Sequence, residues 1–245
     1  MRISPGVSPV VRAGAGAPHC AVPHHVGVIP DGNRRYARQT GVSIEQGYSA
    51  AATKALEVVE WCLEAGVRHL SAFGVSQENI ARRPRDEISW LHEALVHFCR
   101  GVRHMPGVSL HLFGEADGLP AFLRARAELV RFQRNPYTPD VVRMVVHVGV
   151  NYSGQAELAS LIRAVRDRGL EAVADSPEAF TLSNGLPPVD LVIRTAGGQR
   201  LSGFLPLQTA YAELWFTPTL WPALERHEFL HALAWYARQE RRFGE

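Results

Sequence analysis

The sequence predicts a single α/β domain with a mainly parallel, six-stranded sheet covered by helices. Apolar runs of strand length alternate with longer segments of helical periodicity, which is typical of parallel sheets. The strand-like runs are almost continuously apolar, as expected where both faces of a sheet are buried. The chain has 245 residues, 46% of them hydrophobic, which suffices for one sizeable core, and no internal repeat or linker divides it.

Six apolar runs have the length and composition of strands. Valine, isoleucine and aromatic residues are frequent in them, which favours extended structure. The expected strands comprise residues 25–29, 69–75, 109–113, 142–150, 189–193 and 213–216.

Helices are predicted where apolar residues recur every three or four positions. In residues 43–65, Ala51, Ala55 and Val58 share one face, and Gly66 ends the pattern. Further helices are expected from Arg34 onward and over residues 86–104, 119–132, 157–168 and 228–238.

The composition, net charge and cysteine spacing of the chain restrict which cell compartment and which binding partners are expected for the protein. Residues 1–23 are rich in Gly, Ala and Pro and are expected to be a disordered leader before a catalytic domain over 24–245. No apolar run approaches the ~20 residues of a membrane span. A net charge of +2 provides no basic field for nucleic acid. Cys20, Cys62 and Cys99 lack disulfide or zinc-site spacing, which favours the cytoplasm.

The segment after the first strand combines a carboxylate, a tight turn and two guanidiniums. It supplies Asp31, Gly32, Asn33, Arg34 and Arg35. Ligands gather at the carboxyl ends of parallel strands, and the free N–H groups of a helix start attract anions. A diphosphate would suit this corner; the alternative is an Asx-turn with two solvated arginines.

Two further segments on the same edge carry polar groups. Ser76 and Asn79 follow the second strand, although both also suit a plain turn and the cap of the following helix. Arg194 and Arg200 flank a Gly-Gly that lets a ligand approach the backbone, and Ser202 adds a hydroxyl. Because Arg194 ends an apolar strand, its charge needs an anionic partner, which favours a second diphosphate over a loop of solvated arginines.

These motifs, in this order, resemble the cis-prenyltransferase family, which includes undecaprenyl diphosphate synthases and short-chain Z-prenyl diphosphate synthases. The resemblance covers most of the chain, from about His25 to Gly244. It rests on residues 25–37 (H-x-x-x-x-x-D-G-N-x-R-[WY]-A), 76–82 (S-x-E-N-x-x-R), 151–154, 190–202, 210–217, 221–222 and 241–244.

The resemblance implies a homodimer of α/β subunits that uses Mg²⁺ to couple allylic prenyl diphosphates, with a hydrophobic tunnel between the sheet and two helices. Asp31 would hold Mg²⁺ and promote departure of the allylic diphosphate, and Glu213 would complete the metal site. Asn79 would orient the accepting substrate and its loss of a proton, and Ser76 is the third expected catalytic residue. The allylic diphosphate would be bound by Gly32, Asn33, Arg34 and Arg35, and the second diphosphate by Arg194, Arg200 and Ser202.

The tunnel would hold the hydrocarbon tail and set product length. Small residues on the first lining helix and bulky residues on the second favour short products; ordinary core packing is the alternative. The expected lining residues are Tyr36, Ile80, Trp90, Leu91, Leu95 and Phe98.

The chain also departs from the family pattern. Gly198 stands where regular chain elongators usually carry Glu, and Pro30 precedes Asp31 where Met or Cys is common. Both departures resemble the lavandulyl and cyclolavandulyl diphosphate synthases, which join two allylic diphosphates head-to-middle. Ile44 and Tyr48 replace an Arg and a His of many long-chain enzymes.

Three functions are therefore in competition. The first is irregular coupling of dimethylallyl diphosphate with a second allylic diphosphate, either dimethylallyl or geranyl diphosphate. The second is regular addition of isopentenyl diphosphate to give a Z-prenyl or polyprenyl diphosphate. The third is a non-catalytic partner subunit, which the retained Asp31, Asn79, Arg194, Arg200 and Ser202 argue against.

Overall fold

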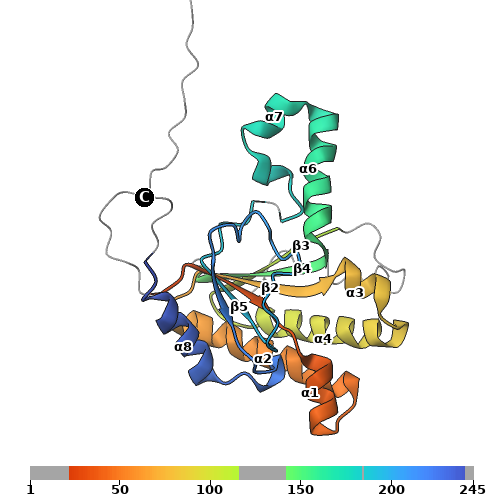
Figure 1. Cartoon of the computed structure of the whole chain (residues 1–245), viewed down its shortest axis with the longest axis vertical. Helices are drawn as coiled ribbons and strands as arrows, with labels where there is room; N and C mark the ends of the chain where they lie inside the picture. Colours follow the sequence, from red (N-terminus) through yellow and green to blue (C-terminus); the bar gives the residue numbers. More distant parts are fainter. Residues whose placement is uncertain (1–21, 116–141, 184, 241–245) are drawn as a thin grey trace, which may run out of the picture.

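Six parallel strands form one sheet at the centre of the molecule, in the order β3-β4-β2-β1-β5-β6 (Figure 1). The computed structural model describes residues 22–115, 142–183 and 185–240. All six predicted strands are confirmed, with ends shifted by at most two residues. They are β1 (His25–Ile29), β2 (His69–Ser76), β3 (Val108–Phe113), β4 (Met144–Tyr152), β5 (Leu191–Arg194) and β6 (Glu213–Phe216).

Five of the predicted helices are confirmed, and the one expected over 119–132 lies outside the described residues. The five are α1 (Asn33–Thr40), α2 (Ile44–Ala65), α4 (Arg85–Arg103), α6 (Gly154–Arg168) and α8 (Arg226–Tyr236). Four short elements were not predicted: α3 (Gln77–Arg82), α7 (Leu170–Ala174), η2 (Pro177–Phe180) and η3 (Trp221–Ala223). With at most six residues each, they are too short to show a helical period.

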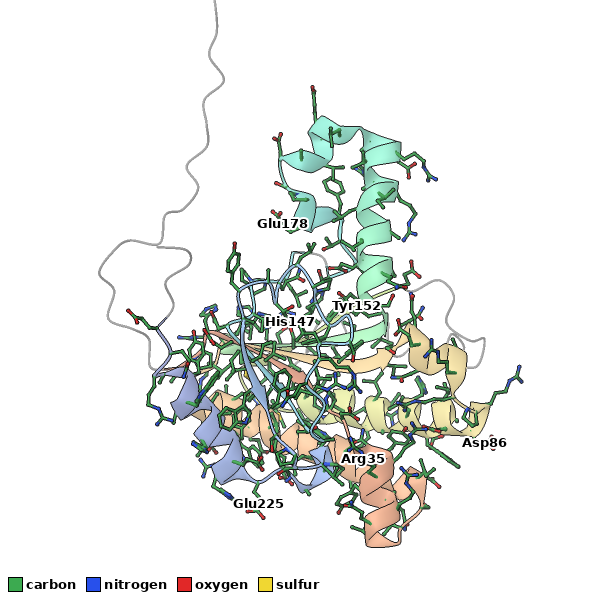
Figure 2. The ribbon with its side chains drawn as sticks, in the orientation of Figure 1. Arg35, Asp86, His147, Tyr152, Glu178 and Glu225 are labelled. Atoms are coloured by element: carbon green, nitrogen blue, oxygen red, sulfur yellow. The ribbon has the colours of Figure 1, made fainter. Side chains whose placement is uncertain are left out.

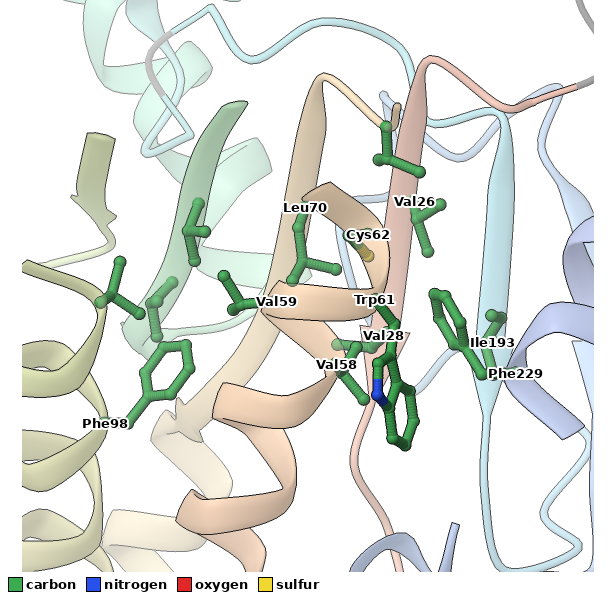
Figure 3. Packing of buried hydrophobic residues seen from close by; sticks show 14 of the residues in the cluster. Val26, Val28, Val58, Val59, Trp61, Cys62, Leu70, Phe98, Ile193 and Phe229 are labelled. Atoms are coloured by element: carbon green, nitrogen blue, oxygen red, sulfur yellow. The ribbon is translucent and has the colours of Figure 1, made fainter. Parts of the chain in front are cut away.

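Helix α2 has clear start and stop signals and buries one face against the sheet. Ser43 and Gln46 form a capping box at its start, and Gly66 ends it with φ 87°. Val58, Val59 and Cys62 are fully buried in the main core, which α4 and α8 complete with Phe98 and Phe229 (Figure 3). These helices lie on one face of the sheet, so the space between them and the strands is apolar.

The opposite face of the sheet is covered mostly by chain without helical structure. A second cluster joins Ile29, Phe113 and Tyr152 to Phe204 and Leu205, which belong to the segment between β5 and β6. Helices α6 and α7 project away from this layer (Figure 1). None of the helices in the described ranges combines the length and apolar character that a membrane span requires.

The first described residues pack against the core. Of the expected leader, residues 1–21 lie outside the described residues, while Val22 packs against the main core and Pro23 is buried. Cys62 and Cys99 are buried free thiols.

A row of histidines crosses the second face of the sheet. His25, His69, His147 and His111 lie on four neighbouring strands. His147 lies 3.0 Å from a ring nitrogen of both His69 and His111, and the His25 ring contacts the Ser71 hydroxyl at 2.7 Å. Figure 2 labels His147 at the centre of the molecule. Because each neutral imidazole has one donor and one acceptor, uncharged rings can satisfy these contacts.

We expect this row to make the protein sensitive to acid. Burial lowers the pKa of His25 to about 4, and burial with neighbouring histidines lowers the pKa of His147 further. Below pH 6.5 the unfolded chain binds protons that the folded chain excludes, so the free energy of unfolding falls as the pH drops toward 4, by about 1.4 kcal/mol per pH unit for each buried histidine. Urea midpoints at pH 7 and pH 5 measure this loss.

His147→Asn is the variant that isolates the effect, because it removes the most strongly shifted imidazole of the row. Its midpoint should change less between pH 7 and pH 5 than that of the unmodified protein. Equal changes in the two proteins would contradict the assignment.

Candidate active site

The parallel pairing of β1 with β5 brings two polar loops together. Ile29 lies opposite Arg194, so Asp31, two residues later, meets the loop that follows β5. The Arg194 Nη2 donates to Asp31 Oδ2 at 2.8 Å. The backbone N–H of Asp31 donates to Thr195 Oγ1 at 3.0 Å, and the Thr195 hydroxyl donates to the Asp31 carbonyl at 2.8 Å. The two loops therefore form one connected unit.

A glycine makes this close approach possible. Gly32 has φ 104°, and a Cβ there would lie 2.9 Å from both the Ala196 Cβ and the Leu220 Cδ2. The Trp221 N–H donates to the Asp31 carbonyl at 3.0 Å, which fixes the corner from a third side. Any larger residue at position 32 would push the Asp31 corner away from the second loop.

The first turn of α1 is built to receive an anion. It contains no acidic residue, and its N-cap, Gly32, offers no side-chain cap to the free N–H groups. Arg35 Nη2 donates to the Ala196 carbonyl at 3.0 Å and lies 3.7 Å from Asp31 Oδ1. Asn33 Oδ1 is buried without a hydrogen-bond partner among the described residues. A polar pocket of about 190 Å³ opens here, lined by Asp31, Gly32, Asn33, Arg34, Arg35, Arg38, Tyr48 and Arg83, with Pro30.

The second loop is organised by a buried guanidinium. The Arg194 side chain is 4% exposed, and its Nη1 donates to the Arg200 carbonyl at 2.6 Å and to Ser202 Oγ at 2.9 Å. Its Nε is buried and has no partner among the described residues. Gly198 lies next to this nitrogen, because a Cβ added at Gly198 would be 2.9 Å from Arg194 Nε. A side chain at position 198 would therefore require the Arg194 guanidinium to shift.

Ser76 and Asn79 lie on the same rim, at the start of α3. The Ser76 hydroxyl accepts a hydrogen bond from the Asn79 N–H at 3.1 Å, so Ser76 is the N-cap that the structural alternative anticipated. The helix it caps is α3 rather than the helix that begins near Asp86. Both residues also line the main cavity.

A cavity of about 660 Å³ runs from the two loops into the space between the sheet and the helices α2 and α4. Its mouth is polar, with Asp31, Asn79, Arg194, Arg200 and Ser202. Its walls are apolar and include Ala51, Ala52, Ala55 and Val58 from α2, and Leu91, Leu95 and Phe98 from α4. A charged mouth above a dry apolar interior suits a molecule with an anionic head and a hydrocarbon tail.

Three of the six expected tunnel residues do not line this cavity. Tyr36 and Trp90 lie outside its wall, and Ile80 packs with Ile88 and Val150 instead. Successive helical residues point about 100° apart, so Trp90 lies to the side of the face on which Leu91 lines the cavity. The expected contact of these three residues with the substrate tail has no support from this cavity and stays a prediction.

Glu213 lies at the amino end of β6, whereas Asp31 follows the carboxyl end of β1. In the pairing of β5 with β6 it lies opposite Leu191, whereas Phe216 lies opposite Arg194 at the carboxyl edge. At about 3.3 Å per residue, Glu213 is roughly 10 Å behind that edge. Within one chain Glu213 therefore does not lie beside Asp31, and its part in a metal site stays a prediction.

The sequence-based reasoning assigned no role in the site to Tyr48, Glu87 and Arg83. Tyr48 is buried on α2 and donates its hydroxyl hydrogen to Glu87 Oε1 at 2.7 Å, and Arg83 Nη1 lies 3.3 Å from the same oxygen. Burial raises the pKa of Tyr48, so the phenol stays protonated. The one available signal was Tyr48 itself, a departure from the family pattern.

The comparisons with known proteins agree with this geometry. Residues 29–244 match the family model described as putative undecaprenyl diphosphate synthase. A short-chain Z-isoprenyl diphosphate synthase of Mycobacterium bovis is 36% identical over 251 residues, covering 96% of this chain and 92% of that protein. The (2Z,6E)-farnesyl diphosphate synthase of Mycobacterium tuberculosis is also 36% identical, with the same coverage of both chains.

A solved structure shows the same fold. Lavandulyl diphosphate synthase from Lavandula x intermedia, in complex with dimethylallyl diphosphate, superposes with a TM-score of 0.80 at 26% identity, covering 92% of this chain and 99% of that one. With a family model that matches most of the chain and relatives above 30% identity, this protein belongs to the undecaprenyl diphosphate synthase family of prenyltransferases.

Proposed function

We propose that this prenyltransferase joins dimethylallyl diphosphate to a second allylic diphosphate, dimethylallyl or geranyl diphosphate, by irregular head-to-middle coupling. The observation that carries the proposal is that Gly198 lies beside the Arg194 guanidinium, where an added Cβ would be 2.9 Å from Nε. Regular chain elongators of the family usually have a Glu at this position. Here Gly198 adds no second carboxylate to the one that Asp31 places against Arg194, so the pocket for the second substrate would differ in shape and charge.

The α1 corner supplies what ionisation of the first substrate requires. When the allylic C–O bond breaks, negative charge develops on the departing diphosphate. The N–H groups at the start of α1, with Arg34 and Arg35, stabilise that charge in a site they already surround. Asn33, whose buried Oδ1 has no hydrogen-bond partner among the described residues, lines both this pocket and the main cavity.

Asp31 fits the role of the Mg²⁺ ligand. Its side chain is 35% exposed and borders both the polar pocket and the cavity mouth. Mg²⁺ keeps several waters and is commonly held by one or two carboxylates with substrate phosphates, so one carboxylate between two diphosphates suffices. No three His, Cys, Asp or Glu residues of the described chain form a metal cage. When bound, the ion would neutralise charge on the leaving diphosphate.

The second substrate would place its diphosphate on Arg200, Ser202 and the exposed side of the Arg194 loop. The tails of both substrates would then share the cavity between α2 and α4, with Asn79 at its mouth orienting the accepting double bond. Val58, Leu95 and Phe98 narrow the cavity, which supports short products. The lavandulyl diphosphate synthase with its bound dimethylallyl diphosphate has the same fold, which also supports this proposal.

Regular addition of isopentenyl diphosphate is the second candidate. It is favoured by the two mycobacterial relatives, which are named as a short-chain Z-isoprenyl and a (2Z,6E)-farnesyl diphosphate synthase and are 36% identical to this chain. Both candidates use the same ionisation chemistry at Asp31. They differ in the molecule that attacks the allylic cation.

A homodimer in the cytoplasm completes the proposal. Leu158 and Ile162 lie one turn apart on the projecting helix α6 and are exposed, as is Leu170 on α7. An apolar strip of this kind suits a self-association surface. Light scattering should give twice the chain mass, and Ile162→Arg should shift the equilibrium toward monomer. A fully active monomer would contradict this part.

Product analysis separates the two candidate reactions. The purified protein, Mg²⁺ and dimethylallyl diphosphate alone should give a branched ten-carbon diphosphate, detected by mass spectrometry after dephosphorylation. The reason is that the second pocket accepts an allylic diphosphate. If product forms only when isopentenyl diphosphate is added, and none forms with added geranyl diphosphate, the irregular coupling is refuted.

Asp31→Asn provides the control for the shared chemistry. The amide keeps the size of the side chain but loses the charge that holds Mg²⁺ and pairs with Arg194. Turnover should fall by about 100-fold or more with either second substrate. Unchanged turnover would remove Asp31 from the catalytic machinery.

A further inference from the structure

A buried carboxylate lies beside the arginines that face the polar pocket. Glu87, on the first turn of α4, is 5% exposed. A negative charge at this position repels a diphosphate, and burying it is costly unless it is paired. Its presence directly behind the residues that line an anion pocket therefore requires an explanation other than direct binding.

The contacts of Glu87 form a closed set. Its Oε1 accepts the Tyr48 hydroxyl hydrogen at 2.7 Å and lies 3.3 Å from Arg83 Nη1, and its Oε2 lies 3.8 Å from Arg34 Nη1. The same Arg83 Nη1 also donates to the Tyr48 hydroxyl. The hydroxyl therefore gives its hydrogen to Glu87 and its lone pair to Arg83, and it has no hydrogen left for a ligand.

These contacts join three separate parts of the chain at one point. Arg34 lies in α1, Tyr48 in α2, and Arg83 and Glu87 at the junction of α3 with α4. Tyr48 is only 2% exposed, yet both it and Arg83 line the polar pocket and the main cavity. Arg83 would otherwise be free to sample many rotamers, which costs entropy when a ligand binds.

We propose that Glu87 and Tyr48 are positioning residues that hold Arg83 in the orientation in which it binds the allylic diphosphate. This rests on the proposed function, because it requires a diphosphate in the α1 pocket. Arg83 touches the ligand, whereas Glu87 and Tyr48 act through Arg83. The gain comes from preorganisation, which outweighs the repulsion between Glu87 and the diphosphate.

Positioning and simple electrostatics predict opposite results for Glu87→Gln. Removing a negative charge from an anion pocket strengthens anion binding if the charge itself is what matters. If Glu87 orients Arg83, the same change weakens binding, because the amide holds a guanidinium less firmly than a carboxylate does. The sign of the change therefore decides between the two.

The experiment measures binding of inorganic pyrophosphate by titration calorimetry, which needs no turnover. Glu87→Gln should weaken the affinity by about tenfold, and Tyr48→Phe by several-fold. The matched control is Glu57→Gln, because Glu57 is a half-exposed carboxylate on α2 paired with Lys54, and it should leave affinity unchanged. In steady-state assays the KM for dimethylallyl diphosphate should rise while kcat stays within about twofold.

A double-mutant cycle of Tyr48 and Arg83 provides a second test that does not depend on folding of the Glu87→Gln variant. If Tyr48 acts through Arg83, then Tyr48→Phe should have no further effect once Arg83→Ala is present. Equal or tighter pyrophosphate binding by folded Glu87→Gln, or a full Tyr48→Phe effect in the Arg83→Ala background, would overturn the positioning role alone. Failure of the unmodified protein to bind pyrophosphate would overturn the proposed function and this inference together.

Discussion

The ion pair between Asp31 and Arg194 is the contact on which the rest of the site depends. It forms because β1 and β5 run in parallel with Ile29 opposite Arg194, so the two strands end side by side. A charge as deeply buried as Arg194 is tolerated only with a partner, and Asp31 provides it. The pair joins the polar pocket at α1 to the loop of Arg194, Arg200 and Ser202, and it places the carboxylate proposed to bind Mg²⁺ between them.

Much of this arrangement could be predicted from the sequence because it depends on local patterns. Continuous apolar runs identified all six strands, and the rule that ligands gather at strand ends placed Asp31, Asn79 and Arg194 on one rim. Two assignments, that of Trp90 to the tunnel and that of Glu213 to the metal site, lack support in the structure for physical reasons. Trp90 is adjacent to Leu91 but points about 100° away from it, and Glu213 begins its strand rather than ending it.

What escaped prediction depends on contacts between distant segments. Tyr48 and Glu87 are separated by 39 positions, and only the packing of α2 against α4 shows that they share a hydrogen bond. Gly198 was visible in the sequence as a departure from the family pattern, but only the structure shows that a Cβ at this position would lie 2.9 Å from the Arg194 Nε. Under the proposed function, the Asp31 corner would ionise an allylic diphosphate, and Gly198 would alter the pocket that holds the attacking molecule.

The central claim is that one chain holds two diphosphates on opposite sides of Asp31. A crystal structure with Mg²⁺ and a non-ionisable thio analogue of dimethylallyl diphosphate tests it most directly. We expect one diphosphate against Arg34 and Arg35 at the start of α1, a second against Arg200 and Ser202, and both tails in the cavity between α2 and α4. Binding at a single pocket, or away from Asp31, would contradict it.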